Sequence, residues 1–208
     1  MQPKPSKNPF DLEISVFGQP HFVDRLALEY QLGKHSLHQA GHYYCLDFFS
    51  IFAASTLLTI SQSIKLILDM CAPPGGKSIF AWKTLKLEFL LCNEAIGKRM
   101  GRLNSNLRRC QINSSAATNA DSKILAEKMP QTANLVIVDA PCTGQSLLAK
   151  GDKAPGCFHH VTINSNANRQ KRILANSAKI VAPQGYLVYM TCPYSTAENE
   201  QVSEWLLS

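Results

Sequence analysis

Short apolar runs alternate with helical patterns from residue 65 to the end of the chain, and this alternation constrains the fold more than any other feature. The apolar runs are nearly uninterrupted, which is typical of strands covered on both faces. Repeated strand–helix units with right-handed crossovers form a parallel, doubly wound sheet, so we predict an α/β fold of this kind. The predicted strands span 65–70, 88–93, 111–118, 134–139 and 186–191, and the predicted helices span 77–86, 94–110, 121–129, 168–183 and the segment after 195.

The common strand order of such sheets, 3-2-1-4-5, makes the fourth and fifth strands neighbours. Ligands of such folds collect at the carboxyl ends of the strands, where all the motifs described below lie. Before the first strand, residues 20–60 are predicted to be mostly helical, with a buried helix over 50–58. Near the other end, Ser195 and Glu198 have the spacing of a capping box, which would begin the last helix.

The composition suits one globular domain, because 45% of the 208 residues are apolar and 17% are charged. The net charge of +6 is compatible with a polyanionic partner but does not require one. The N-terminus lacks the apolar stretch of a signal peptide, and no segment is apolar enough to span a membrane. We expect a cytoplasmic protein, in keeping with the cysteine usage described next, and we expect it to be a monomer.

The seven cysteines form no C-x-x-C pair, which argues against a disulfide framework and against an ordinary zinc site. Cys157, His159 and His160 lie close together in the sequence. A metal site would need a second cluster of ligands at proper spacing, so no metal is predicted.

The segment "LDMCAPPGGKS" (68–78) has the order strand, turn, helix. Gly75 and Gly76 allow the backbone to pass close to a ligand, and the N-terminus of the following helix favours polar or anionic groups. An ATP-type phosphate loop would require glycine at position 71, where Cys71 stands. The turn therefore favours a different nucleoside-containing ligand.

An acidic residue, Glu94, follows the second strand, 18 residues after Gly76. Acidic residues at about this distance bind ribose hydroxyls in nucleoside-binding doubly wound folds. This pattern suits an adenosine-containing cofactor such as S-adenosylmethionine. Glu94 also suits a carboxylate that only stabilises a helix N-terminus. Asp121 is a further cofactor candidate near the third strand, although it also suits a helix N-cap, and Asn113 and Asn119 compete for the same place.

Two cysteines follow the fourth and fifth predicted strands, in "DAPCTG" (139–144) and "TCPYS" (191–195). A metal pair, a disulfide, two core residues and two catalytic thiols are the alternatives. Neighbouring strands would place both thiols at one pocket, which favours chemistry. A thiolate that adds to carbon 6 of a pyrimidine makes carbon 5 nucleophilic enough to accept a methyl group. Asp139 would then stabilise the adduct at ring N3, and the two thiols would divide attack and release.

Methylation of an exocyclic amine is the alternative reaction, and it needs no protein nucleophile. Enzymes of that kind favour an Asp/Asn-Pro-Pro-aromatic turn after the fourth strand. Here the turn reads Asp139-Ala140-Pro141-Cys142, with cysteine in place of the aromatic residue. The sequence therefore favours carbon methylation.

Three segments, "LDMCAPPGGKS", "DAPCTG" and "YMTCPYSTAENEQV", together resemble the Sun-type (RsmB-like) RNA cytosine-5 methyltransferases over roughly residues 40–208. The resemblance implies S-adenosylmethionine as methyl donor and a single-stranded or flipped cytosine of rRNA or tRNA as substrate. It implies Cys192 as nucleophile, Cys142 in product release, Asp139 against the base and Lys77 in support of Asp139. The implied cofactor-binding residues are Cys71, Ala72, Pro73, Pro74, Gly75, Gly76, Lys77, Glu94, Asp121 and Asp139.

The sequence departs from the family in three places. Pro73 stands where the turn usually has alanine, and Pro193 stands where serine or threonine often follows the nucleophile. Two further strands usual in the family are expected to be missing after residue 208. We thus divide the chain into an N-terminal extension, 1–39, and a methyltransferase domain, 40–208. A catalytically inactive, truncated RNA-binding module and a nucleic-acid N-methyltransferase are the alternative functions.

Contacts to RNA phosphates would come from basic side chains of this domain. The alternative interpretation is that these side chains only form the solvent-exposed faces of helices. The candidates are Arg99, Arg102, Arg108, Arg109, Lys150, Lys153, Arg169, Lys171 and Arg172.

Overall fold

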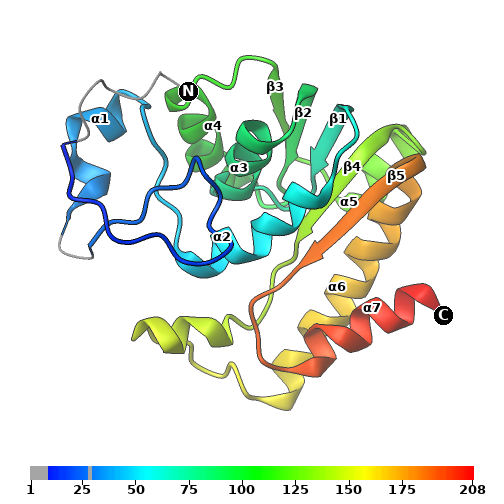
Figure 1. Cartoon of the computed structure of the whole chain (residues 1–208). Helices are drawn as coiled ribbons and strands as arrows, with labels where there is room; N and C mark the ends of the chain where they lie inside the picture. Colours follow the sequence, from blue (N-terminus) through cyan, green and yellow to red (C-terminus); the bar gives the residue numbers. More distant parts are fainter. Residues whose placement is uncertain (1–8, 28–29) are drawn as a thin grey trace.

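The computed structural model describes residues 9–27 and 30–208, and it contains a five-stranded parallel sheet (Figure 1). The strand order is β3-β2-β1-β4-β5, as predicted, and every neighbouring pair is parallel. The predicted doubly wound α/β fold is therefore confirmed. The strands are β1 (Ile64–Asp69), β2 (Leu87–Asn93), β3 (Ser115–Thr118), β4 (Ala133–Asp139) and β5 (Val181–Met190).

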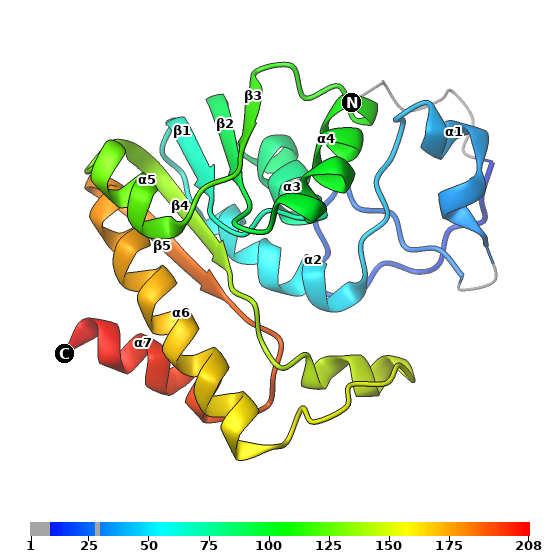
Figure 2. The same cartoon turned by 180° about the vertical axis from the view of Figure 1, so that it is seen from behind.

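Helices cover both faces of the sheet (Figures 1 and 2). One face packs against α2 (Phe48–Ala54), α3 (Gly76–Thr84) and α4 (Met100–Arg109), and the other against α5 (Ser122–Lys128), α6 (His160–Ile180) and α7 (Glu200–Leu207).

Successive residues of each central strand enter opposite cores. Ile67 and Ile137 belong to the core under α3, whereas Leu68 and Val136 belong to the core under α6. Side chains alternate across a strand, so a strand buried on both faces has to be apolar throughout. This explains the uninterrupted apolar runs of the sequence.

The prediction that residues 20–60 are mostly helical is wrong. Among the described residues of that range, helical turns are confined to η1 (Leu32–Lys34), α1 (Ser36–Gln39), α2 and η2 (Ser55–Thr59). The guanidinium of Arg109 donates to the carbonyls of His38 at 2.7 Å and Tyr43 at 3.1 Å. These carbonyls find a partner on α4 instead of the partners a continuous helix would supply.

The helix predicted over 50–58 is divided between α2 and η2, and only one face of it is buried. Ala54 and Leu57 are fully buried, whereas Phe52 and Leu58 are 73% and 45% exposed. The prediction of a buried helix therefore holds for that one face.

Four elements, α4, β3, α6 and β5, begin four or more residues away from their predicted starts. Strand β3 begins at Ser115 instead of residue 111, because Gln111 has a left-handed backbone conformation (φ +55°) that a strand does not adopt. After β2, the Glu94 carboxylate accepts a hydrogen bond from the Ile96 amide at 2.7 Å, and this turn delays the α-helix to Met100. Helix α6 begins eight residues before the predicted start at 168, and it ends at Ile180. Residues 181–185 were predicted to end that helix, but they begin β5, where the register with β4 shifts. Proline is tolerated at such an irregular strand start, which accounts for Pro183.

Within the described parts of the chain, no helix has the length and apolar character needed to cross a membrane.

Candidate active site

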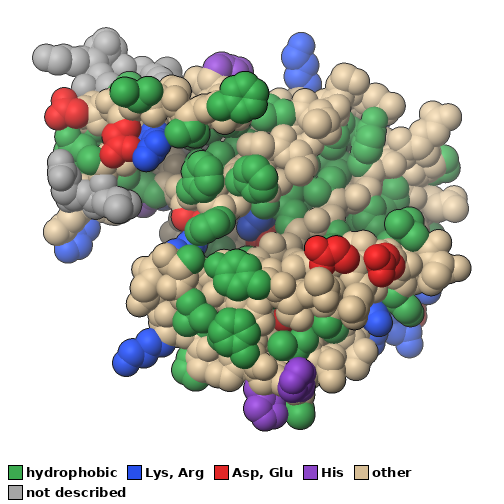
Figure 3. Space-filling model, turned by 60° about the horizontal axis from the view of Figure 1, so that its bottom comes forward, with side chains coloured by type: hydrophobic (Ala, Val, Ile, Leu, Met, Phe, Trp, Pro, Cys, Tyr) green, Lys and Arg blue, Asp and Glu red, His purple; other side chains and the backbone are tan. Residues whose placement is uncertain are grey.

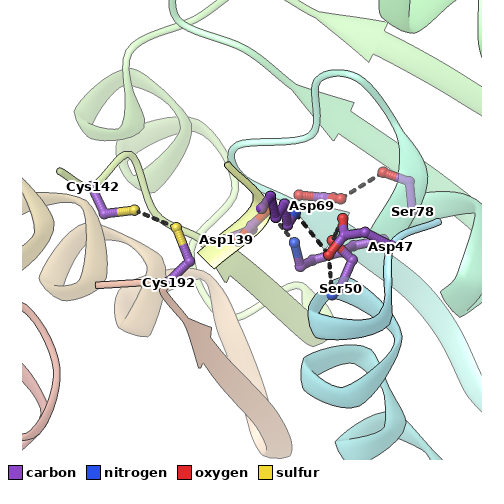
Figure 4. Close-up of polar contacts among 9 residues, drawn as sticks. Asp47, Ser50, Asp69, Ser78, Asp139, Cys142 and Cys192 are labelled. Atoms are coloured by element: carbon purple, nitrogen blue, oxygen red, sulfur yellow. Dashed lines mark hydrogen bonds and ion pairs between the residues drawn. The ribbon is translucent and has the colours of Figure 1, made fainter. Parts of the chain in front are cut away.

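The carboxyl ends of β4 and β5 bring the two predicted thiols together (Figure 4). Asp139, the last residue of β4, pairs with Met190 of β5, and the Ala140 amide donates to the Met190 carbonyl at 3.0 Å. The chain therefore leaves both strands at one level. Cys142 and Cys192 follow, with their Sγ atoms 3.1 Å apart and no disulfide between them.

The two thiols differ in acidity although they are neighbours. A hydrogen bond from the Cys142 thiol lowers the pKa of Cys192 to about 6, against the opposing effect of partial burial. The Ser146 hydroxyl adds to this lowering. Cys142 donates this hydrogen bond to Cys192 and is itself partly buried, and both effects raise the pKa of Cys142 well above the ordinary value. At neutral pH the pair therefore carries one thiolate, on Cys192, and one proton, on Cys142.

A lysine–aspartate ion pair lies at the end of β4, close to the thiols. Lys77, from the first turn of α3, is 2.6 Å from Asp139 through Nζ and Oδ2. The Lys77 side chain is 15% exposed, whereas the Asp139 side chain remains 35% exposed. Lys77 therefore pairs with Asp139 and leaves part of its carboxylate open, and the supporting role of Lys77 stays a prediction.

A second carboxylate, Asp69, ends β1 and is buried. Its Oδ2 accepts a hydrogen bond from the Ser78 hydroxyl at 2.5 Å, while its Oδ1 has no protein partner (Figure 4). Burial raises the pKa of Asp69 to about 7, and the hydrogen bond from Ser78 opposes this effect. A buried oxygen without a partner is costly, so this atom suits a ligand that donates a hydrogen bond or carries positive charge.

The Asp69 carboxyl should make folding stability depend on pH. Its folded pKa of about 7 lies above the ordinary value of 3.8. The protonated Asp69 carboxyl therefore contributes its full stabilisation of the fold below about pH 3.8, and this stabilisation is lost as the pH rises through 7. The difference between the two pKa values corresponds to roughly 4 kcal/mol of unfolding free energy. As the pH rises from 4.5 to 8, the unfolding free energy of Asp69→Asn should therefore increase relative to that of wild type by up to this amount.

Urea unfolding of both proteins at pH 4.5, 6 and 8 measures this gain. Asp152→Asn is the matched control, because Asp152 is exposed, and its stability should follow wild type. A constant difference between Asp69→Asn and wild type at all three pH values would contradict the prediction.

The glycine turn joins β1 to α3 in close contact with two neighbouring segments. Gly75, the residue before α3, has φ +103°, which glycine adopts readily. A Cβ on Gly76 would lie 2.6 Å from Cδ2 of Leu46. The Ala72 amide donates to the Asn93 carbonyl at 2.9 Å, and the Asn106 amide group donates to the Pro74 carbonyl at 2.8 Å.

Cys71 lies within this turn, and burial raises its pKa well above the ordinary value. Its thiol therefore remains protonated at neutral pH and does not compete with Cys192 as a nucleophile.

Of the other cofactor candidates, Asp121 makes the N-cap contact of its alternative interpretation, whereas Glu94 binds a turn that precedes α4. Glu94, which is 5% exposed, accepts from the Ile96 amide and, at 3.3 Å, from the Arg99 guanidinium. Asp121 is exposed and caps α5 through a 2.8 Å hydrogen bond from the Lys123 amide. Asn119 donates to the Glu94 carbonyl. Glu94 and Asp121 follow the carboxyl ends of β2 and β3. Their roles toward a cofactor remain predictions.

Four of the basic side chains predicted to contact phosphates already have protein partners. Arg99 pairs with Glu94, Lys150 pairs with Asp47 at 3.0 Å, and Lys171 lies over the Trp205 ring. Arg109 binds the N-terminal carbonyls described above. The ion pair of Lys150 joins the N-terminus of α2 to η4 (Gln145–Lys150), the segment that follows Cys142. On this side of the molecule the surface is hollowed, with charged side chains inside and hydrophobic ones around them (Figure 3).

In the described ranges, no group of three His, Cys, Asp or Glu side chains is arranged to hold a metal ion. Cys157, His159 and His160, which are close in sequence, form no such group.

Three buried polar residues beside the thiols were missed as site residues. Glu198 was predicted to complete a capping box with Ser195, and this prediction is wrong. Its side chain is fully buried and accepts hydrogen bonds from Thr143 and Gln170 instead. Gln145 accepts from the backbone amides of Tyr194 and Ser195. Only the full burial of these side chains distinguishes them, and spacing in the sequence does not reveal it.

The site residues fit S-adenosylmethionine, which carries a ribose diol, an amino group and a sulfonium charge. The orphaned Oδ1 of Asp69 and the open part of Asp139 suit positive or hydrogen-donating groups. Glu94 retains acceptor capacity for hydroxyls, because a carboxylate has about four lone-pair sites and Glu94 uses two.

The parallel sheet, the glycine turn after β1 and the acidic residue after β2 define the class I methyltransferase fold. The solved structure of PH0851 superposes on 86% of this chain with a TM-score of 0.78 and 26% identity, and the match covers 40% of that chain. The structure described as NSun6 from Pyrococcus horikoshii with SFG matches 90% of this chain and 50% of its own, with a TM-score of 0.70 and 21% identity.

The model of the 16S rRNA methyltransferase RsmB/F family matches residues 56–208, so the chain belongs to this family. The family methylates with S-adenosylmethionine, as predicted. Ribosomal RNA small subunit methyltransferase F of Vibrio parahaemolyticus is 31% identical over 176 residues, or 84% of this chain. Its counterpart from Vibrio cholerae is 31% identical over 172 residues. The chain spans only 37% and 36% of the length of these relatives.

Proposed function

We propose that this chain transfers a methyl group from S-adenosylmethionine to carbon 5 of a cytosine in RNA, through a covalent adduct on Cys192. The observation that carries the proposal is the pair of unequal thiols, 3.1 Å apart at the ends of β4 and β5. Residues 40–208 would form the methyltransferase domain, and we expect it to act as a monomer on rRNA or tRNA.

The Cys192 thiolate begins the reaction by adding to carbon 6 of the cytosine ring. Its lowered pKa supplies the thiolate at neutral pH without a separate base. Carbon 5 then carries enough electron density to accept the methyl group that S-adenosylmethionine supplies. The target base has to be single-stranded or extruded, because carbon 6 is inaccessible inside a stacked helix.

Asp139 interacts with the base at N3 and stabilises the adduct. Lys77 holds the carboxylate through Oδ2, so its orientation is set before the base arrives. Once Cys192 is bonded to the ring, it no longer raises the pKa of Cys142 as a charged neighbour. Cys142 then loses its own proton to solvent and, as a thiolate, takes the carbon-5 proton, while the carbon 5–carbon 6 double bond re-forms and Cys192 leaves as a thiolate, the release role that the family resemblance implies. The approach of a substrate to both thiols is compatible with their partial exposure.

Nucleoside analysis tests the proposal directly. The purified chain is incubated with methyl-labelled S-adenosylmethionine and unmodified small-subunit rRNA, which is then digested and analysed by mass spectrometry. We expect labelled 5-methylcytidine. Labelled N4-methylcytidine would establish nitrogen methylation instead. The absence of both label transfer and any thermal shift with S-adenosylmethionine would favour an inactive RNA-binding module.

A further inference from the structure

Two buried polar side chains join the loops that carry the two thiols, and each reaches from one loop to the other. Glu198 lies beyond Cys192 in the sequence, and its carboxylate binds the residue after Cys142. Gln145 lies beyond Cys142, and its amide binds the residues after Pro193. Both side chains are almost completely buried, at 0% and 1% exposure. Buried polar groups of this kind hold a fixed geometry only if their hydrogen bonds are made.

Glu198 uses both carboxylate oxygens on the Cys142 loop. Its Oε1 accepts from the Thr143 amide at 3.0 Å, and its Oε2 accepts from the Thr143 hydroxyl at 2.6 Å. Gln170 of α6 donates from one Nε2 to both Glu198 Oε1 and the Pro141 carbonyl, each at 3.0 Å. The residues on either side of Cys142 are therefore fixed relative to Glu198.

Gln145 makes the reciprocal connection to the Cys192 loop. Its Oε1 accepts from the amides of Tyr194 at 2.5 Å and Ser195 at 3.1 Å, while its Nε2 donates to the Cys157 carbonyl at 2.8 Å. The Ser146 amide also donates to the Cys192 carbonyl at 3.2 Å. The two loops are thus joined by the side chains of Glu198 and Gln145. None of the hydrogen bonds that these two side chains make involves a thiol.

We propose that Glu198 and Gln145 are positioning residues that set the separation of the Cys142 and Cys192 thiols. This inference rests on the proposed two-thiol reaction. Geometry matters there because both thiols must reach one base, and a displacement of about 1 Å at a reacting centre costs about 100-fold in rate. Glu198 acts through its hydrogen bonds to Thr143, and its negative charge takes no part in the chemistry.

Glutamine is the informative replacement for Glu198. A glutamine Oε1 can accept from the Thr143 amide and from Gln170, and its Nε2 can donate to the Thr143 hydroxyl. Glu198→Gln therefore keeps the connection between the loops and removes only the charge. Glu198→Ala removes the connection. Glu200→Gln is the matched control, because Glu200 lies two residues further along and is exposed.

The first measurement is the rate at which diamide joins Cys142 and Cys192 in a disulfide, followed by peptide mass. One thiolate adds to the azo bond of diamide, and the second thiol displaces the hydrazine product as the disulfide forms. Closely held thiols react as if at very high concentration, so Glu198→Ala should slow this step by about tenfold or more. Glu198→Gln and Glu200→Gln should remain within about threefold of wild type.

The second measurement is steady-state methylation of RNA. Glu198→Ala should lower kcat roughly 100-fold and leave KM for RNA within about threefold, with Glu198→Gln close to wild type. Thr143→Ala removes the hydrogen bond from the Thr143 hydroxyl to Glu198. It should lower the rate of disulfide formation and kcat, each by less than Glu198→Ala does. Thermal unfolding checks that each variant is folded, and Thr143→Ala carries the test if Glu198→Ala does not fold.

Two results would overturn the inference. Unchanged disulfide formation in folded Glu198→Ala, or in Thr143→Ala where that variant carries the test, would show that the loops hold their geometry without the connection. Equal losses in Glu198→Gln and Glu198→Ala would assign the effect to charge. Failure of the proposed function is distinguishable, because wild type would then not methylate RNA while the disulfide measurement would still report the thiol separation.

Discussion

Replacing Cys192 by alanine is expected to reduce methyl transfer to RNA on the order of 10⁴-fold or more. The reason is that carbon 5 of cytosine is a poor nucleophile, and only addition of a thiolate at carbon 6 activates it. Cys142 is a poor replacement for Cys192, because burial still raises the pKa of its thiol after the hydrogen bond to Cys192 is lost. Binding of S-adenosylmethionine should be unaffected, because the glycine turn follows β1 whereas Cys192 follows β5.

Cys45→Ala is the control for this loss. Cys45 is also a free, exposed cysteine, and it lies outside the loops after β4 and β5. Methyl transfer by Cys45→Ala should match wild type in a single-turnover assay with labelled S-adenosylmethionine. Undiminished transfer by folded Cys192→Ala would remove Cys192 from the mechanism.

Replacing Cys142 by alanine is expected to trap the reaction after methyl transfer. Cys192 would still attack at a pH that ionises it without the hydrogen bond from Cys142, because it remains exposed and Ser146 and Lys77 still favour its thiolate. Without the second thiol, removal of the carbon-5 proton slows and Cys192 remains bonded to the base. A stable RNA–protein adduct should therefore accumulate as turnover falls by roughly 100-fold or more.

Denaturing gel electrophoresis with labelled RNA detects this adduct. The combined Cys142→Ala and Cys192→Ala protein is the control, and it should form none. If Cys142→Ala loses turnover without any adduct, the release role of Cys142 is wrong. The hydrogen bond from Cys142 is the main cause of the lowered pKa of Cys192. The assay is therefore run at pH 8, where Cys192 of both wild type and Cys142→Ala forms the thiolate more readily.

The sequence predicted the features that depend on local order along the chain. Uninterrupted apolar runs identified the parallel strands, and the common strand order placed Cys142 beside Cys192. The family resemblance predicted that Lys77 supports Asp139; the structure contains the 2.6 Å ion pair between them, and the role of Lys77 stays a prediction. These features depend on strand ends, which a parallel sheet brings to one edge.

The features missed in the sequence depend on contacts between distant segments. Glu198 has capping-box spacing, yet the Thr143 amide and hydroxyl, 55 residues away, are its partners. Arg109 reaches the carbonyls of His38 and Tyr43, so that the N-terminal segment needs no continuous helix. Tertiary hydrogen bonds of this length have no periodic signal, and local propensity therefore gave the wrong structure at both places.

The central claim is that Cys192 bonds to a cytosine that is being methylated. The most direct test is to incubate Cys142→Ala with S-adenosylmethionine and RNA, digest the adduct with nuclease and protease, and measure peptide masses. The account predicts one modified peptide, containing Cys192 and carrying a methylated cytidine nucleotide. A modified peptide that contains a different cysteine, or methylated RNA formed without any protein adduct, would contradict it.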